Sequence, residues 1–399
     1  MRVFRYRDFR LFWLGAFFSF TGSWVQNVAQ GWLVYEMTND AAKLAFVSFV
    51  GMVPVSIVGP FAGAITDRHD KKTILVLCQA IFALGALTLG TLTALNIVQY
   101  WHIVVIALIN GFAGALEMPT RQSVVSRVVP PDELAAAIPI QAMTFNFARV
   151  VGPAIGGFIL SRIGPQACYF INGFSYTALI AAILAIRADL GVANMVKPTL
   201  KELLFGGAKF TFQEPRLRVL FILEAAVSIF GIFYVMLMPA IARDMLGLDA
   251  RGLGNAFLMA GVGAMSALIV NSRLAATSSR PDWIAPMMAA LGLSLIGVAF
   301  TRTAALAFPL FAAIGFCSVF QFNTTNTVFQ YLAPEHLRGR VLSMHVWALA
   351  GLSPVGTLAF GEVAERYGIS TALMVGGSVV VLFALWGLRF GGMLREAAR

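Results

Sequence analysis

The chain has 399 residues, of which 59% are hydrophobic and only 12% are charged. A soluble domain carries about 25% charged residues, so the composition excludes a soluble protein and indicates a polytopic membrane protein. The formal net charge of +10 does not indicate nucleic-acid binding, because the basic residues lie in short loops between apolar segments.

The first predicted element is a membrane-spanning helix with a basic flank. Arg2, Arg5, Arg7 and Arg10 precede an apolar run that continues to Tyr35. This run is longer than the apolar core of a secretory signal, and no small-residue cleavage site ends it. We therefore expect the start of the chain to cross the membrane as its first helix.

Apolar runs of about 20 residues, the length needed to cross a bilayer, recur along the rest of the chain. They predict an all-α membrane protein with about twelve transmembrane helices near residues 10–36, 42–66, 73–96, 101–121, 134–160, 167–187, 217–240, 252–273, 282–301, 304–328, 341–364 and 370–390. The predicted domains are an N-terminal six-helix bundle at 1–188, a cytoplasmic linker at 189–215 and a C-terminal six-helix bundle at 216–399. Most of the 29 lysines and arginines fall on the side that holds both termini, which predicts that both termini are cytoplasmic.

The two halves carry an internal repeat. Pro131-Asp132-Glu133-Leu134 precedes the fifth predicted helix, and Pro334-Glu335-His336-Leu337 precedes the eleventh. Each of these helices contains a cluster of glycine and proline. Such pseudo-symmetric repeats are typical of secondary transporters, whose substrate site lies near the middle of the membrane.

Ionisable residues inside predicted spans mark the candidate coupling site. They are Glu117, Arg121, Arg149 and Glu224. Each costs roughly 2.5–3.5 kcal/mol near a helix centre, so such groups usually face the protein interior or a wet cavity. Glu117 and Arg121 are four residues apart, which is compatible with a local ion pair as well as with a coupling role. Our hypothesis is that Glu117 or Glu224 carries a coupling proton and that Arg149 responds to its charge.

Uncharged polar residues are concentrated in a few of the predicted helices. We interpret some of them, with one tryptophan, as candidates for a substrate cavity, while helix–helix hydrogen bonding remains the alternative; the set is Gln26, Asn27, Gln30, Asn146, Gln321, Asn323, Asn326 and Trp347. His345, near the start of the eleventh helix, is interpreted as an interfacial polar residue rather than a proton relay. The three cysteines and four histidines show no metal-ligand spacing, so we expect no metal and no cofactor.

Two motifs carry a resemblance to a known family. The loop after the second helix contains Gly63, Asp67, Arg68, Lys71 and Lys72, and it resembles the loop motif of the major facilitator superfamily, with Asp70 where that motif often has a glycine. This would be a gating motif. The fifth helix contains a second motif, made of Gly152, Pro153, Gly156 and Gly157, which resembles the antiporter motif of the same superfamily and predicts close helix packing.

Other segments narrow the resemblance. Phe9 to Gly15, Met118 to Gln122, Asn146 to Pro153 and Leu337 to Val341 resemble the bacterial branch that includes the enterobactin exporter and macrolide-efflux-type carriers. The resemblance implies two six-helix bundles, alternating access and export driven by a proton gradient. It also implies a location in the bacterial cytoplasmic (inner) membrane. The arginine that many proton-driven members carry midway along the fourth helix has no counterpart between Ala107 and Gly111.

The expected function is therefore export of a small amphipathic organic compound, such as a drug, siderophore or metabolite, by proton antiport. The expected partners are this substrate, protons and the lipid bilayer, with a monomer as the expected state and no nucleic acid. One alternative is a uniporter or symporter that imports a polar nutrient. Another is an intramembrane lipid-modifying enzyme, although the paired acids or clustered histidines that its metal site requires are missing from the sequence.

Overall fold

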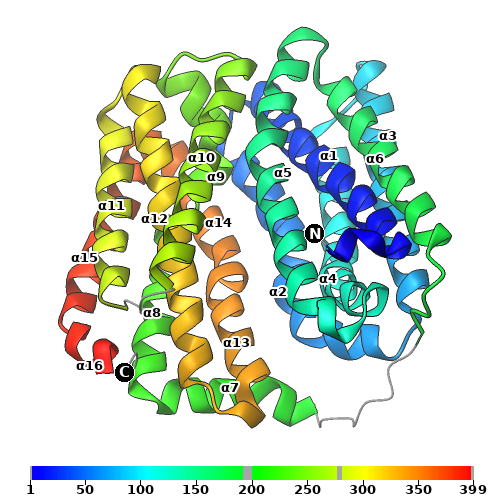
Figure 1. Ribbon diagram of the computed structural model, residues 1–399. Helices are drawn as coiled ribbons and strands as arrows, with labels where there is room; N and C mark the ends of the chain where they lie inside the picture. The colour runs from blue at the N-terminus through cyan, green and yellow to red at the C-terminus, as the bar shows by residue number, and fades with distance from the viewer. Residues whose placement is uncertain (1, 192–199, 276–280, 397–399) are drawn as a thin grey trace. The chain divides into compact units, whose positions relative to one another are not determined.

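The computed structural model (Figure 1) describes residues 2–191, 200–275 and 281–396, and within these ranges every regular element is helical. The chain packs as two compact units, each considered by itself below. Unit 1 contains residues 1–39, 50–196 and 249–255, and unit 2 contains residues 40–49, 197–248 and 256–399. The sequence-based domain boundaries at 188 and 216 remain a prediction, and the predicted linker lies outside the described residues at positions 192–199.

Unit 1 is built from long helices joined by short turns. Its elements are η1 (Arg2–Arg5), α1 (Arg7–Thr38), most of α2 (Ala41–Asp67), α3 (Lys71–Ala94), α4 (Tyr100–Val128), η2 (Pro131–Glu133), α5 (Leu134–Arg162) and α6 (Pro165–Ala185). The turn between α5 and α6 requires a positive φ of 106° at Gly164, which glycine adopts without steric cost, and Pro165 then begins the helix.

Unit 2 repeats this arrangement with more interruptions. Its helices are α7 (Leu200–Gln213), α8 (Pro215–Phe230), α9 (Tyr234–Ala240), η3 (Ile241–Met245), α10 (Ala250–Ala275, with its first residues in unit 1), η4 (Pro281–Trp283), α11 (Ile284–Phe300), α12 (Ala304–Leu332), η5 (Glu335–Leu337), α13 (Arg338–Val346), η6 (Trp347–Gly351), α14 (Ser353–Tyr367), α15 (Ile369–Leu388) and α16 (Gly391–Glu396). Gly368, with φ of 90°, occupies the turn before α15 that Gly164 occupies before α6.

Twelve helical segments in the described residues account for the predicted spans. Eleven are long and apolar enough to cross a membrane, and α1, with 32 residues and several polar side chains, is the twelfth. Two predicted spans are not single helices. The segment from Pro215 to Met245 is divided between α8, α9 and the π-helix η3, and the segment from Arg338 to Tyr367 is divided by the π-helix η6. π-Helical turns inside longer helices are frequent at functional sites.

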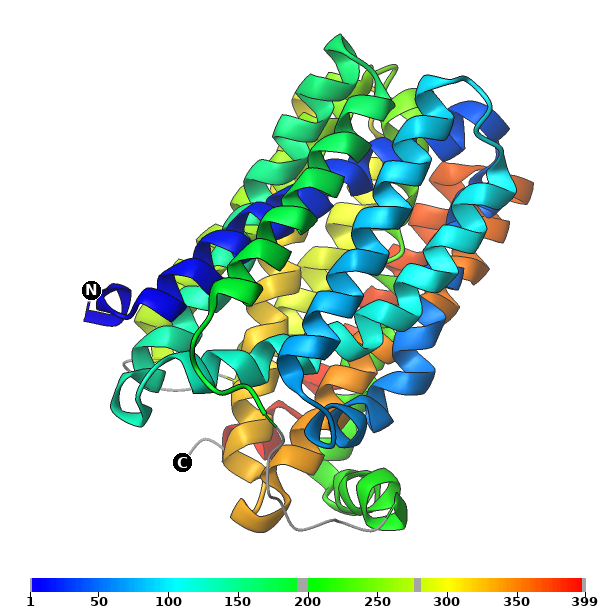
Figure 2. The same ribbon diagram turned by 90° about the vertical axis from the view of Figure 1, so that its right-hand side faces the viewer.

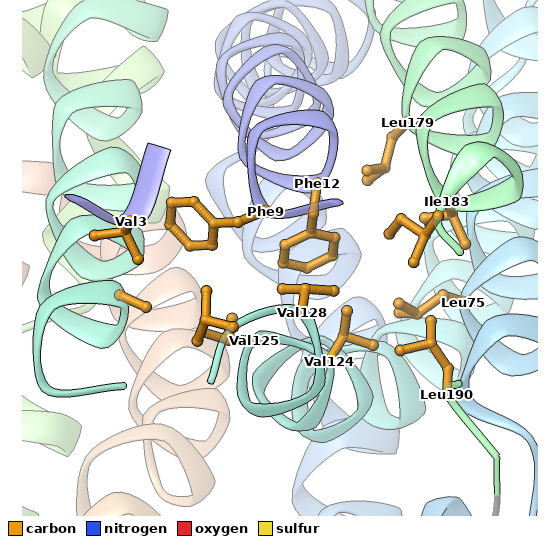
Figure 3. Packing of buried hydrophobic residues seen from close by; sticks show 13 residues of the cluster. Val3, Phe9, Phe12, Leu75, Val124, Val125, Val128, Leu179, Ile183 and Leu190 are labelled. Atoms are coloured by element: carbon orange, nitrogen blue, oxygen red, sulfur yellow. The ribbon is translucent and has the colours of Figure 1, made fainter. Parts of the chain in front are cut away.

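Helix contacts in unit 1 centre on α1 and α6. α1 packs along α6 and α5, and α3 packs on the other side of α6, as Figure 2 shows for the blue and green helices. One end of the unit holds an apolar cluster that joins η1, α1, α3, α4 and α6 (Figure 3). Its central side chains, Phe9, Phe12 and Val124, have no exposed surface. This cluster fixes the ends of α1 and α4, and therefore the height of the polar residues farther along both helices.

Unit 2 contains a very close helix pair between α10 and α12. A Cβ added to Gly263 would lie 1.8 Å from the carbonyl oxygen of Ala312, and one added to Gly315 would lie 1.9 Å from that of Ala260. The two backbones therefore touch at both positions, as small residues allow in membrane helices. α8 packs against α15, α14 and η6, while α7 packs against α13.

Candidate functional site

Unit 1 contains a buried ion pair between two of the predicted charged residues. Glu117 and Arg121 lie one turn apart on α4, and both the Nε and Nη2 atoms of Arg121 contact Oε1 of Glu117. The side chains are only 12% and 8% exposed. The guanidinium carbon of Arg121 also lies 4.3 Å from the ring centroid of Phe20 on α1, which is a cation–π geometry. The local ion pair that the spacing permits is therefore formed.

One residue of another helix bonds this pair, and two further polar contacts join neighbouring helices of unit 1. Gln79 on α3 donates from Nε2 to Oε1 of Glu117 at 3.3 Å. Farther along, Asn172 on α6 donates to Gln26 on α1 at 2.7 Å, and the hydroxyls of Ser23 and Tyr176 lie 2.9 Å apart; these contacts join α1 to α6. Nη1 of Arg121 is buried and has no hydrogen-bond partner in the described part of the chain.

Arg149 takes part in none of these contacts. It lies on α5, half-buried, and forms neither a hydrogen bond nor an ion pair with any described residue. The proposed partnership between Glu117 and Arg149 is therefore not formed, because Arg121, on the same helix as Glu117, already satisfies its carboxylate. A pair four residues apart needs no tertiary contact, whereas a pair between α4 and α5 needs both helices to present the two side chains to each other.

Glu224 forms the corresponding polar centre of unit 2. It lies on α8 with no exposed surface, and its Oε2 accepts a hydrogen bond of 2.7 Å from Nε2 of Gln321 on α12. The hydroxyl of Thr325, one turn along α12, bonds both Gln321 and Glu224. Oε1 of Glu224 and Oε1 of Gln321 are buried without a partner among the described residues. Unlike Glu117, this carboxyl has no ion pair with a described cation.

His345 is fully buried, which corrects its interpretation as an interfacial residue. It lies on α13 with 0% exposure, between the rings of Phe322 and Phe329 of α12 at centroid distances of 4.7 and 5.2 Å. Neither ring nitrogen has a hydrogen-bond partner among the described residues. The sequence interpretation failed because nearness to a helix start does not reveal whether another helix covers the side chain.

The uncharged candidates divide into two groups. Gln26 and Gln321 are buried and bond to other helices of their own units, as described above. The others remain partly or well exposed, and where they bond they bond within their own helix: Asn146 to Ala142, Asn323 to Val319, and Asn326 to Gln330. Asn27 is exposed, Gln30 is half-buried, and Trp347 is 39% exposed while stacking on Phe221 at 6.2 Å. Only this second group is available to a ligand in the described conformation.

The loop motif fastens the end of α6 within unit 1. Nζ of Lys72 donates to the carbonyl oxygens of Leu184 and Ile186 at 3.0 and 3.1 Å, and Lys71 donates to that of Gly191 at 3.4 Å. Cations near the C-terminus of a helix complement its unpaired carbonyl groups and its dipole. Arg68 is exposed, while the surroundings of Gly63 and of the Asp67 side chain are outside what the structure describes.

Asp70 replaces the expected turn glycine with a helix cap. Its Oδ2 accepts hydrogen bonds from the backbone N–H and the hydroxyl of Thr73, at 2.8 and 2.7 Å. Partial burial raises the pKa of the Asp70 carboxyl, but these bonds, a backbone bond from Lys72 and the charge of Lys72 together hold its pKa below the ordinary value. An aspartate at this position begins α3 by satisfying an unpaired N–H group.

The glycines of the fifth-helix motif lie at close backbone contacts. A Cβ on Gly152 would lie 2.5 Å from Cβ of Trp24, and one on Gly156 would lie 3.0 Å from Cα of Val25, both on α1. A Cβ on Gly157 would lie 2.7 Å from Cα of Gly254, in the part of α10 that belongs to unit 1. Pro153, between them, is buried.

Several residues of these networks were not among the sequence-based candidates. They are Gln79, Asn172, Tyr176 and Thr325. A usable signal existed for Gln79 and Asn172, because a single amide in an otherwise apolar span usually needs a partner on another helix. The hydroxyl residues gave no such signal, since serine and threonine can bond to the preceding turn of their own helix.

The sequence is similar to those of several known transporters. The chain is 23% identical to the staphyloferrin A transporter of Staphylococcus aureus, with 92% of each chain covered. It is 23% identical to the multidrug efflux pump Tap of Mycolicibacterium fortuitum, with 88% of each covered, and 22% identical to macrolide efflux protein A of Streptococcus pyogenes, with 94% of each covered.

Solved structures show the same fold. A crystal structure of a variant of the nucleoside transporter NupG matches with a TM-score of 0.81 over 96% of this chain and 99% of that chain, at 13% identity. The family model described as transmembrane secretion effector matches residues 2–397. The protein is thus a multi-pass membrane transporter of small compounds and not an enzyme. The chain belongs to the transmembrane secretion effector family of the major facilitator superfamily.

Proposed function

We propose that this protein exports a small amphipathic organic compound by proton antiport, and that Glu224 binds the coupling proton. The observation that carries the proposal is the surroundings of Glu224: a fully buried carboxyl held by two neutral side chains, with one oxygen unpartnered among the described residues. The exporter part is supported by two relatives whose names give efflux, the multidrug efflux pump Tap and macrolide efflux protein A, and a third relative is named as the staphyloferrin A transporter.

The two buried carboxyls are suited to different tasks. Glu117 is held by the guanidinium of Arg121, so its negative charge is compensated at all times. Glu224 faces only the amide of Gln321 and the hydroxyl of Thr325. A buried charge without an opposite charge is strongly unfavourable, and a proton bound at Oε1 removes it. Release of that proton from the protein requires a conformation in which water reaches the polar centre of unit 2, which is the kind of change that alternating access supplies.

The substrate class follows from the candidates that remain available. Asn27, Asn146, Asn323 and Asn326 offer neutral donors and acceptors, and Trp347 offers a partly exposed aromatic face. Neutral amides and an aromatic face are side chains suited to a compound with polar groups on an apolar body. In this proposal the halves at 1–188 and 216–399 act as the two moving bundles of a monomer, and Arg149 contacts the substrate or its counter-charge.

Transport by purified protein in liposomes tests the proposal. Ethidium, erythromycin and staphyloferrin A are the probes, each measured with and without an imposed pH gradient. We expect export of at least one probe to rise with the gradient, and Glu224→Gln to lose the gradient-driven component while it retains probe exchange. Glu362→Gln is the matched control, because Glu362 is half-exposed and pairs with Arg366 at the end of α14. Full gradient-driven export by Glu224→Gln would contradict the coupling role, and gradient-driven import of the probes would contradict export.

A further inference from the structure

His345 is a buried polar residue to which the proposed transport cycle assigns no role. Its imidazole has no exposed surface, lies between Phe322 and Phe329, and has no hydrogen-bond partner at either nitrogen within the described residues. Leaving a buried polar atom unsatisfied costs about 1–3 kcal/mol. A state in which its nitrogens have a partner would therefore be favoured by a similar free energy.

A hydrogen bond between α8 and η6 relates the position of His345 to that of Glu224. The hydroxyl of Ser228 on α8 donates to the carbonyl oxygen of Leu349 in η6 at 2.5 Å. Glu224 lies one turn before Ser228, and His345 lies one turn before Leu349. Because α8 contacts both α13 and η6, the two ionisable residues each lie one helical turn before the same hydrogen bond between neighbouring segments.

α12 contacts both Glu224 and His345. Its Gln321 and Thr325 bond Glu224, while its Phe322 and Phe329 enclose His345. Both groups therefore pack against the same two turns of one helix. Four buried polar atoms without a partner among the described residues belong to these side chains: Oε1 of Glu224, Oε1 of Gln321 and both nitrogens of His345.

No other described group competes for this role. The elements packed against α13 are α7, α8, α12, η5 and η6. Their described ionisable side chains, besides Glu224, are Lys209 on α7, Arg216 and Arg218 on α8, Cys317 and Tyr331 on α12, and Glu335 on η5. Lys209, Arg218, Tyr331 and Glu335 are exposed, and Nε of Arg216 lies 3.8 Å from Oε1 of Glu214. Cys317 lies on α12 before Gln321, more than one turn from Phe322 and more than three turns from Phe329.

We propose that His345 accepts the proton that Glu224 releases, directly or through one water molecule, so that the two residues form a proton relay within unit 2. This inference rests on the proposed proton-binding role of Glu224. In the step, the O–H bond at Oε1 of Glu224 breaks and an N–H bond forms at the unprotonated ring nitrogen of His345. The products are a carboxylate and an imidazolium, whose opposite charges stabilise each other where water is excluded. The rings of Phe322 and Phe329 keep bulk water from the imidazole and add a favourable cation–π contact once it is charged.

A substrate-free measurement tests the relay first. Protein labelled with ¹⁵N at its four histidines is studied in lipid by solid-state NMR, with His345→Gln used to assign the signal of His345. We expect the ¹⁵N chemical shifts of His345 to change with pH in the wild type. In Glu224→Gln we expect this change to be absent or to occur at a different pH. The signal of His102, which caps α4 far along the chain, is expected to be the same in both proteins.

Infrared spectroscopy separates failure of this inference from failure of the proposed function. The carboxylic C=O band that disappears in Glu224→Gln reports whether Glu224 binds a proton at all. If no such band titrates, the coupling role of Glu224 fails. If the band titrates but the His345 signal is identical in wild type and Glu224→Gln, the relay alone is overturned.

Transport variants give the functional test. Proton transfer by a positioned side chain contributes roughly 10²–10⁴-fold to a rate, so His345→Gln and His345→Phe are expected to reduce gradient-driven export of the transported probe by at least about tenfold. Probe exchange without a gradient is expected to stay within about twofold, since only the proton step is removed. His345→Phe fills the aromatic pocket, so its folding does not depend on the imidazole. Wild-type gradient-driven export by either variant would overturn the relay.

Discussion

At the scale of single residues, the buried carboxyls of Glu117 and Glu224 differ in whether a cation lies beside them. Arg121 compensates Glu117 and rests on the ring of Phe20, so the pair ties α4 to α1. Glu224 lacks a cation and is held by an amide and a hydroxyl instead. The same residue type therefore forms an ion pair in unit 1 and is the proposed proton carrier in unit 2.

This difference predicts a large stability effect at Arg121. Replacing Arg121 with Gln leaves the Glu117 carboxylate buried and unpaired, which costs about 3–5 kcal/mol. We expect the free energy of unfolding in detergent, measured by denaturant titration with circular dichroism, to fall by this amount. Arg366→Gln is the control, since Arg366 and Glu362 have the same spacing but side chains that are 67% and 50% exposed. Its effect is expected to stay below about 1 kcal/mol.

The double variant Glu117→Gln with Arg121→Gln checks the cause. Removing both charges leaves no unpaired group, so we expect it to be clearly more stable than Arg121→Gln alone. Equal stability of the single and double variants would mean that the loss comes from packing of the arginine side chain on Phe20 and not from the charge.

At the scale of helices, the interruptions of unit 2 are the main departure from regular structure. The π-helix η6 begins two residues after His345, and its Leu349 carbonyl accepts a hydrogen bond from the hydroxyl of Ser228. A π-turn frees a carbonyl from the helical ladder, which makes such a contact between segments possible. The interrupted helix thus places His345 beside α8 and α12, where the proposed relay requires it.

The α10–α12 pair carries a prediction at the same scale. Gly263→Ala would place a methyl group against the Ala312 carbonyl, at a position where a Cβ has only 1.8 Å of space, so the helices must separate. We expect a clear loss of folded yield and a lower melting temperature in detergent, measured by size exclusion and thermal unfolding. Gly114→Ala in α4 is the control, because its Cβ would meet no atom closer than 4.0 Å. It is expected to be neutral or slightly stabilising, since alanine has the higher helix propensity. Equal yields and melting temperatures would contradict the close contact.

At the scale of the whole molecule, the distribution of basic residues predicts the orientation in the membrane. Single cysteines are introduced into a chain whose buried Cys78, Cys168 and Cys317 are replaced by alanine. We expect Asp132→Cys, in η2, to react with an impermeant maleimide only from the cytoplasmic side of bacterial membranes. Tyr367→Cys, which is 69% exposed in the wild type at the end of α14, is expected to react only from the opposite side. The reverse pattern would refute the predicted cytoplasmic termini.

The sequence predicted the helical class, the family and most helix positions, because spanning a bilayer imposes a length and an apolar composition that are visible residue by residue. It also identified Glu117, Arg121 and Glu224, since charge inside a span is rare. The sequence left Arg121 and Arg149 as alternative partners of Glu117, and the structure shows that Arg121 forms the ion pair.

Burial and partnership across helices were decided by the tertiary structure alone. His345 and Asn27 are both polar residues in apolar surroundings of the sequence, yet one is enclosed by two phenylalanines and the other is exposed. Which face of a helix meets another helix depends on rotation about the helix axis, and in a span that is apolar on all sides no local pattern records that rotation. The chain by itself therefore determines that this protein is a membrane transporter with charges inside its spans, while the packing of α8, α12 and α13 determines which of those charges meet.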